Sequence, residues 1–149
     1  CRGYQGGGGV SSPLPQPAPI DRTGWDAGRW DDEADSHQWV TKAGLRAAWI
    51  RDPHMGFLCG YVETPEALSG EMYDRLGFTP HGGLTFSGPL AGQSWWLGFD
   101  CAHGGDIKPV GLFHSLYDDT SRGAKYRTAA FVEAECEKLA AQIVEFCEP

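Results

Sequence analysis

The chain has 149 residues, which is the length of one domain. Its formal net charge is −8 and no stretch gathers lysine and arginine, which argues against a nucleic-acid duplex as partner. No apolar run approaches the roughly 20 residues that span a membrane. Hydrophobic residues make up 41% of the chain and include six tryptophans and seven phenylalanines, enough apolar surface for a packed core.

The cysteines are odd in number and none lies in a C-x-x-C pair. This pattern argues against a disulfide framework and favours a reducing compartment, so we expect a cytoplasmic protein. An alternative stays open, since Cys1 followed by a flexible stretch also fits the start of a mature bacterial lipoprotein. The five are Cys1, Cys59, Cys101, Cys136 and Cys147.

Residues 1–20 are predicted to form a flexible tail, because a glycine run is followed by prolines at alternate positions. No residue of this tail is expected to pack. Residues 21–149 then form one domain. At its start, an acidic segment over 21–37 carries Trp25 and Trp30. We interpret it as an irregular stretch that pins both indoles onto the domain and leaves its carboxylates solvated. The alternative is an acidic and aromatic docking strip.

Three strands are predicted next. Residues 37–52 read as a hairpin with a turn at Lys42-Ala43-Gly44, and the second arm alternates at period two. Residues 57–63 carry apolar side chains on both faces, which indicates a buried, central strand. Residues 64–80 contain several prolines and glycines, so we expect a long connection with one helical turn in 66–76.

Residues 83–87 and 93–100 are two further strands, joined by a turn over 88–92, and residues 101–120 are loop-like. Residues 128–146 predict an amphipathic helix with Thr128 as its N-cap. The expected fold is therefore α+β: a small antiparallel sheet with a C-terminal amphipathic helix packed on one face. The apolar stripe of the helix is Val132, Cys136, Leu139, Ile143 and Phe146.

Two polar clusters lie at strand junctions. His81-Gly82-Gly83 precedes the strand over 83–87, and Asp100-Cys101-Ala102-His103 ends the strand over 93–100. If these strands pair as a hairpin, the start of the first lies beside the end of the second. The sequence therefore predicts one site, whose catalytic residues are His81, Asp100 and His103.

Such a site supports two chemistries. His81, His103 and Asp106 (or Asp100) are suitable ligands for a divalent, zinc-like transition metal, with a position left for water. Without a metal, an imidazole paired with a carboxylate is a general acid or base. A structural reading remains open too: Asp100 bonds its own turn, His103 stacks on Trp96, and the glycines allow positive φ.

Four further residues are weaker binding candidates. Cys101 is a nucleophile if a nearby imidazolium lowers its pKa, and otherwise a small buried apolar residue. Tyr61 and Glu63 lie on a strand that we expect to line the same cleft, and Trp96 lies on the strand before the second cluster.

A set of motifs lies between about residue 24 and residue 143: Gly24-Trp25, Trp30-Asp31-Asp32-Glu33, Asp35, Leu58-Cys59-Gly60-Tyr61-Val62, His81-Gly82-Gly83-Leu84-Thr85-Phe86, Trp95-Trp96-Leu97-Gly98-Phe99-Asp100-Cys101-Ala102-His103, Asp106, Tyr126-Arg127 and Glu135-Cys136. On these motifs, the chain resembles a family of small uncharacterised proteins of tailed bacteriophages and prophages. The segment 64–80 departs from the family, which tends to have a Gly/His/Pro loop there, and this puts a loop-borne site residue in doubt. The resemblance implies a phage origin and no particular mechanism.

The resulting expectation is a phage accessory protein in the cytoplasm of an infected bacterium. It would carry a small hydrolase-like site, metal-assisted in one form, that acts on a small polar or nucleotide-type substrate. The alternative is a binding module that inhibits a host defence protein or sequesters a ligand. Its partner is accordingly a small molecule or a host protein, and the oligomeric state stays open.

Overall fold

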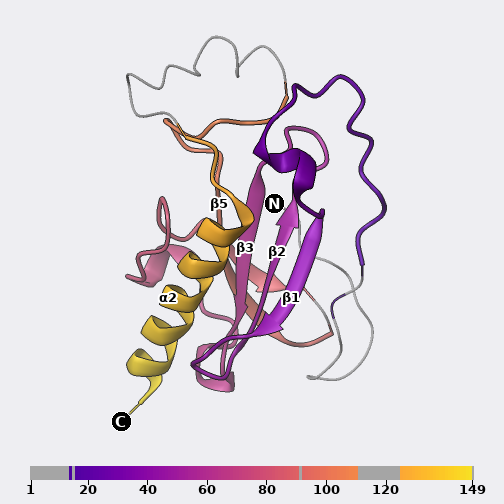
Figure 1. Cartoon of the computed structure of the whole chain (residues 1–149). Helices are drawn as coiled ribbons and strands as arrows, with labels where there is room; N and C mark the ends of the chain where they lie inside the picture. The colour runs from indigo at the N-terminus through magenta and orange to yellow at the C-terminus, as the bar shows by residue number, and fades with distance from the viewer. Residues whose placement is uncertain (1–13, 15, 91, 111–124, 149) are drawn as a thin grey trace.

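The computed structural model describes residues 14, 16–90, 92–110 and 125–148. Within them, five antiparallel strands form one sheet in the order β1-β2-β3-β5-β4, and one long helix, α2 (Ala129–Cys147), lies across one face (Figure 1). The predicted α+β fold is therefore confirmed. The strands are β1 (Ser36–Val40), β2 (Arg46–Arg51), β3 (Leu58–Glu63), β4 (Phe86–Pro89) and β5 (Trp95–Asp100).

The first hairpin forms as predicted. β1 pairs with β2, and the turn between them closes through a hydrogen bond of 2.9 Å from the Thr41 N–H to the Leu45 carbonyl. Gly44 adopts a φ of +91°, a left-handed conformation that favours glycine. β3 then pairs with both β2 and β5, which confirms that it is central.

The two faces of β3 belong to two separate clusters of buried side chains. Leu58 and Val62 point to the face covered by α2, whereas Cys59 and Tyr61 point to the opposite face. Gly60 lies on the helix side, where an added Cβ would come within 2.4 Å of the Phe99 ring. The alternation that predicted a strand buried on both sides therefore holds.

Helix α2 begins as predicted, since the Thr128 hydroxyl accepts a hydrogen bond of 3.2 Å from the N–H of Phe131. Of the five residues in the predicted apolar stripe, Phe146 is not buried. It lies in the last turn, is 62% exposed and meets the ring of Phe78 edge-on at 5.6 Å. The other four are fully buried: Val132, Cys136, Leu139 and Ile143.

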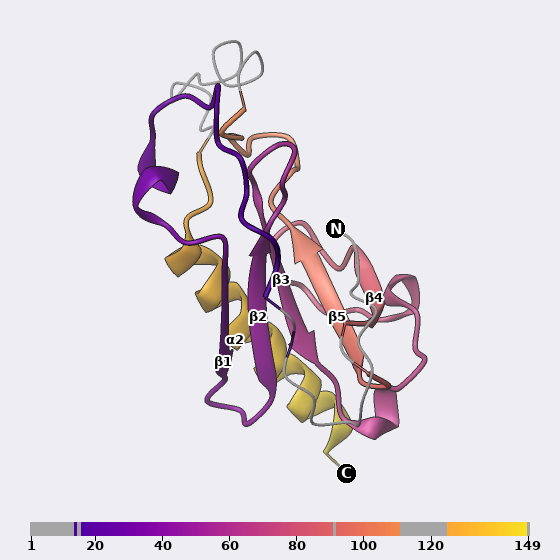
Figure 2. The ribbon, with the colours of Figure 1, turned by 90° about the vertical axis from the view of Figure 1, so that its right-hand side faces the viewer.

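The long connection between β3 and β4 contains two short 3₁₀ helices, η2 (Glu66–Leu68) and η3 (Tyr73–Arg75), where one helical turn was expected. A third, η1 (Arg29–Asp32), lies in the acidic segment. Figure 2 shows this segment at the β1 side of the sheet. η1 buries Trp30, as predicted.

The sheet face opposite α2 is covered partly by the described part of the segment before residue 21, which passes over it in Figure 2. Leu14 is 5% exposed and packs among Ala48, Tyr61 and Trp96. Its carbonyl accepts a hydrogen bond of 2.9 Å from the side chain of Gln38. The expectation that no residue of 1–20 packs is therefore wrong at Leu14, because a leucine among the prolines can cover an open apolar face. Residues 1–13 and 15 lie outside the described residues.

Among the described cysteines, Cys101, Cys136 and Cys147 are free thiols, whereas Cys59 is disulfide-bonded. The expectation of thiols without disulfides is thus wrong at Cys59. No helix in the described part of the chain is long and apolar enough to cross a membrane.

Candidate functional site

The β4–β5 hairpin brings the two predicted polar clusters together. Phe86 lies opposite Gly98 in the ladder, and the N–H of Thr85 continues it with a hydrogen bond of 2.9 Å to the Gly98 carbonyl. The chain before β4 therefore meets the chain after β5. The rings of His81 and His103 pack edge to face with centroids 5.6 Å apart.

Asp106 is the centre of the cluster. Its side chain is fully buried, and its Oδ2 lies 2.8 Å from Nε2 of His81. The Nε–H of Arg127 donates to Oδ1 at 2.8 Å, and the backbone N–H of His103 donates to Oδ2 at 3.0 Å. The sequence placed Asp106 among the metal ligands, and the structure instead makes it the partner of His81.

These contacts set the charge of Asp106. Burial by itself would raise the pKa of this carboxyl group, but the hydrogen bonds from Arg127, His81 and the His103 N–H outweigh burial and lower the pKa. The group is therefore an ionised carboxylate, which only accepts hydrogen bonds. Nε2 of His81 must then carry a proton, and in the neutral ring the lone pair lies on Nδ1.

The second imidazole has its own carboxylate. Nε2 of His103 lies 3.4 Å from Oδ1 of Asp100, which is an ion-pair distance, but this nitrogen makes no hydrogen bond within the described residues. Asp100 also accepts hydrogen bonds from the hydroxyl of Thr85 at 3.0 Å and from the N–H of Ala102 at 3.1 Å. The predicted bond of Asp100 to its own turn is therefore present, and it coexists with the contact to His103.

Gly82 is required by the position of His103. A Cβ added to Gly82 would lie 2.2 Å from Nε2 of His103, so the imidazole occupies the space that any side chain would need. The φ of Gly82 is +70°, which also favours glycine. The His-Gly-Gly motif thus supplies His81, and the missing side chain of Gly82 leaves the space that the His103 ring occupies.

Helix α2 provides a wall for this cluster. The ring of Phe131 lies 5.2 Å from that of His81, edge to face, and 5.0 Å from the guanidinium carbon of Arg127. Neither Arg127 nor Phe131 was predicted as a site residue. The available signal was the position of Arg127 directly before the helix N-cap Thr128.

Cys101 does not have the properties of a nucleophile. It is 2% exposed and belongs to the core beneath α2. Burial raises the pKa of its thiol, and the carboxylates of Asp106 and Asp100 raise it further. The thiolate is therefore strongly disfavoured, and the alternative prediction of a small buried apolar residue fits.

The remaining predicted binding residues are not brought to the histidines. Tyr61 is buried on the sheet face away from α2, where its ring meets Phe86. Glu63 bonds Arg46 and lies opposite Trp96 in the ladder, at the end of β3 away from Cys59, which is the residue opposite Asp100. The expectation that Glu63 lines the same cleft as the histidines is not supported, because Glu63 lies at the opposite end of β3 from Asp100.

Trp96 does not stack on His103 as the structural reading suggested. It is buried on the face away from α2, with the guanidinium of Arg46 5.3 Å above its ring. The aromatic partner of His103 is instead His81.

The metal prediction finds no matching geometry in the described residues, which contain no group of three or more His, Cys, Asp or Glu placed to hold an ion. His81, His103 and Asp106 do lie together, but both carboxylate oxygens of Asp106 already accept hydrogen bonds from protein groups. Metal binding stays a prediction.

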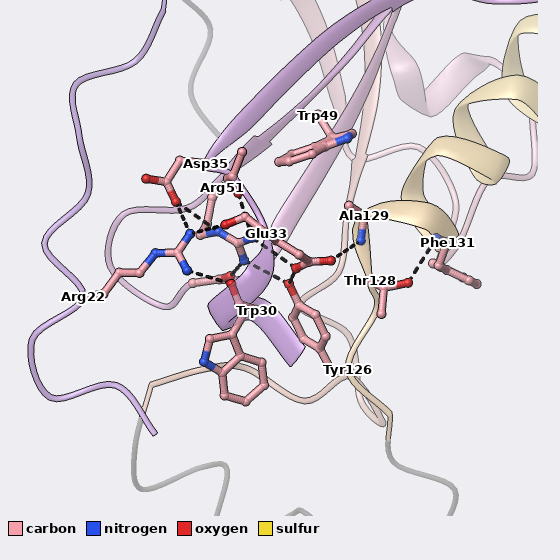
Figure 3. A network of polar contacts seen from close by, with 12 residues as sticks. Arg22, Trp30, Glu33, Asp35, Trp49, Arg51, Tyr126, Thr128, Ala129 and Phe131 are labelled. Carbon is pink, nitrogen blue, oxygen red and sulfur yellow. Dashed lines mark hydrogen bonds and ion pairs between the residues drawn. The ribbon is translucent and has the colours of Figure 1, made fainter. Parts of the chain in front are cut away.

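A second polar network, drawn in Figure 3, adjoins this cluster and was missed from the sequence. Its centre is Arg51 of β2, whose side chain is fully buried. The guanidinium donates to the Gly56 carbonyl at 2.8 Å, the Tyr126 hydroxyl at 2.9 Å and Oε1 of Glu33 at 3.2 Å. Oε2 of Glu33 accepts from the N–H of Ala129 at 2.6 Å, at the start of α2.

The acidic segment is therefore more than an anchor for indoles. Trp30 is pinned against Tyr126 as expected, with ring centroids 5.0 Å apart. Glu33 and Asp35, however, are not solvated, because Glu33 bonds Arg51 and Asp35 pairs with both Arg51 and Arg22. The sequence signal for this network was Arg51, the last residue of β2, which directly follows four apolar residues.

The two networks meet at consecutive residues. The Tyr126 hydroxyl lies between Arg51 and Glu33, and Arg127 binds Asp106 beside His81. Burial raises the pKa of Tyr126, so its hydroxyl keeps its proton. The stretch before α2 is thus held from both sides, which fixes Arg127 at the histidine cluster.

No known protein family, curated protein or solved structure matches the chain. The resemblance to phage proteins stays a prediction.

Proposed function

We propose that His81 and His103 are the acid–base pair of a small hydrolase-like site that acts on a small polar or nucleotide-type substrate. One observation carries the proposal: two imidazoles lie 5.6 Å apart and each faces its own carboxylate. Hydrolysis needs two proton transfers, one from the attacking water and one to the leaving group, and paired imidazoles supply both.

His81 is suited to be the base. Asp106 holds its Nε2–H and leaves the lone pair of Nδ1 unused, since the described residues offer that atom no hydrogen-bond donor. The side chain is 17% exposed. When His81 becomes an imidazolium, the buried carboxylate of Asp106 stabilises the new charge, so Asp106 is a positioning residue.

His103 is suited to be the acid. As an imidazolium it is stabilised by Asp100 at 3.4 Å. Its Nε2 is buried against Gly82, so Nδ1 is the nitrogen that would donate a proton to the substrate. Its side chain is 32% exposed, more than that of His81.

The proposed step consumes one water. His81 takes a proton from the water as the water oxygen bonds to the electrophilic atom of an ester. The bond from that atom to the leaving oxygen breaks, its electron pair stays on that oxygen, and His103 protonates it. Solvent then returns the two histidines to their starting states.

The resemblance to phage proteins supports a role in infected bacteria, where small polar metabolites and nucleotides are available substrates. An accessory phage protein with this activity would remove such a molecule from the host. A reaction of this kind needs neither a large interface nor a membrane.

Release of p-nitrophenol from p-nitrophenyl acetate, p-nitrophenyl phosphate and bis(p-nitrophenyl) phosphate tests the proposal. Hydrolysis should fall about 100-fold or more in His81→Asn and in His103→Asn. His54→Asn is the matched control, because His54 is an exposed histidine in the turn before β3. Turnover that is absent in the wild type, or equal in all three variants, would contradict the proposal. Ligand binding without turnover would favour the alternative of a binding module.

A further inference from the structure

We infer that Arg127 is an anion-binding residue of this site and that the substrate carries a phosphate group. The inference rests on the proposed function, because it names the substrate class of the same site. Its basis is that one end of the Arg127 guanidinium makes a hydrogen bond to the protein and the other end does not.

The inner end of that guanidinium is bound. Its Nε–H donates to Asp106, and the group lies over the ring of Phe131 at 5.0 Å. The outer nitrogens, Nη1 and Nη2, have no acceptor within the described residues, and the side chain is 24% exposed. Arginine presents its donors as a planar fork that matches two oxygens of a phosphate.

The fork is also held in place before any ligand arrives. Asp106 accepts a hydrogen bond from the Nε–H of Arg127, and the ring of Phe131 packs against the guanidinium. The backbone on either side of Arg127 is fixed by the hydrogen bond of Tyr126 and by the Thr128 cap. An arginine that is already ordered loses little conformational freedom on binding an anion.

The position of the fork suits the proposed chemistry. Arg127 and His81 bind the same carboxylate and pack against the same ring of Phe131. An anion held by Nη1 and Nη2 would therefore lie beside the histidine pair. When His103 carries a proton, it adds a second positive charge there.

The overall charge narrows the substrate class. With a net charge of −8, the protein repels polyanions over long distances, whereas a small anion feels mainly the local field of Arg127 and an imidazolium. We therefore expect a small phosphate ester, of the size of a nucleoside monophosphate, and no nucleic-acid strand.

Titration with adenosine monophosphate and with inorganic phosphate, followed by calorimetry and by NMR of the Arg127 Nε–H, tests the inference. Adenosine and acetate are the ligand controls, since they lack the phosphate. Both phosphate probes should bind and shift the Nε–H signal, and the two controls should bind at least about tenfold more weakly. Equal binding of acetate would overturn the phosphate assignment.

The variants Arg127→Gln and Arg127→Lys separate the fork from the charge. Binding of adenosine monophosphate should weaken about tenfold or more in Arg127→Gln and by a smaller factor in Arg127→Lys, which keeps the charge beside Asp106. Arg75→Gln removes the same charge from exposed η3 and should bind as the wild type does. If Arg127→Gln fails to fold, Arg127→Lys decides: binding equal to the wild type would overturn the inference.

The inference and the proposed function fail in different ways. Phosphate binding that needs Arg127, without hydrolysis of any ester, would keep Arg127 as a phosphate-binding residue and remove the proposed function. If hydrolysis of p-nitrophenyl acetate needs His81 but phosphate binding is unchanged in both Arg127 variants, the proposed function is kept and the role of Arg127 is removed.

Discussion

The imidazole of His103 occupies the space where a side chain at residue 82 would begin, since a Cβ on Gly82 would lie 2.2 Å from its Nε2. Backbone and ring are therefore in direct contact across the two polar clusters. The glycine is as much a part of the site as the histidines.

Substitution of Gly82 should consequently move His103. In Gly82→Ala we expect a loss of about 1–2 kcal/mol from the positive φ, a displaced imidazole and reduced hydrolysis. Gly83→Ala is the matched control, because Gly83 has a φ of +82° but no atom within 4 Å of an added Cβ. It should lose similar stability and leave the His103 ring signals in NMR spectra unchanged. Equal displacement of His103 in both variants would contradict the contact.

Removal of the Asp106 charge should destabilise the fold. Asp106→Asn leaves Arg127 and His81 without their carboxylate, and we expect a loss of about 2 kcal/mol in urea unfolding. The loss is below that of a fully buried ion pair because Arg127 and His81 are partly exposed. Asp100→Asn should lose about 1 kcal/mol, since Asp100 accepts from the neutral groups of Thr85 and Ala102.

Stability should also depend on pH through Asp106. Its pKa is lowered in the folded state, so the contribution of its carboxylate is complete above the ordinary aspartate pKa of about 3.9. That contribution is lost as the pH falls from there through the lowered folded pKa. Urea unfolding between about pH 6 and about pH 2 should show the wild type approaching Asp106→Asn at the acidic end. A difference between them that stays constant with pH would refute this assignment.

Glu33 should contribute far more to stability than its exposed acidic neighbour Asp32. Glu33→Gln removes the charge that faces buried Arg51 and the N–H of Ala129, and we expect a loss of about 3 kcal/mol. Asp32→Asn changes an exposed carboxylate of the same segment and should alter stability by less than about 0.5 kcal/mol. Thermal or urea unfolding measures both. Similar values for the two would mean that the buried network contributes little.

The prediction of a metal site at the histidine cluster can be tested separately from the acid–base proposal. If His81, His103 and Asp106 hold zinc, metal analysis should find one ion per chain, and added zinc should raise the melting temperature of the wild type but not of His81→Asn. If metal analysis finds no stoichiometric metal and hydrolysis persists in a chelator, the metal prediction is wrong and the metal-free acid–base site remains.

The meeting of His81 and His103 could be predicted because it depends on local signals. Period-two alternation marks the strands, and Gly88 and Gly92 indicate a turn between them, although Gly88 and Pro89 belong to β4 and the turn begins after them. Antiparallel pairing then places residues before one strand beside residues after the other. The alternation also separated Leu58 and Val62 from Cys59 and Tyr61, and the helix cap at Thr128 was visible directly.

The pairing of each histidine with its carboxylate could not be predicted, because it depends on how the loop after β5 turns back. Asp106 reaches His81 because its side chain also binds the backbone N–H of His103, and Arg127 comes from the stretch directly before α2. Neither event leaves a periodic pattern. The same holds for Arg51, whose partners come from the acidic segment and from the start of α2.

The adjacency of Tyr126 and Arg127 has a consequence for where the folding unit can be cut. A chain shortened to begin at β1 would lack Glu33 and Asp35, and would leave the guanidinium of Arg51 and the N–H of Ala129 without their carboxylates. Tyr126 would lose its hydrogen bond to Glu33 and keep only Arg51 as a partner of its hydroxyl, and Arg127 follows it directly. The smallest fragment that keeps the histidine cluster in order therefore includes the acidic segment, although no hydrogen bond or ion pair among the described residues joins that segment to His81 or His103.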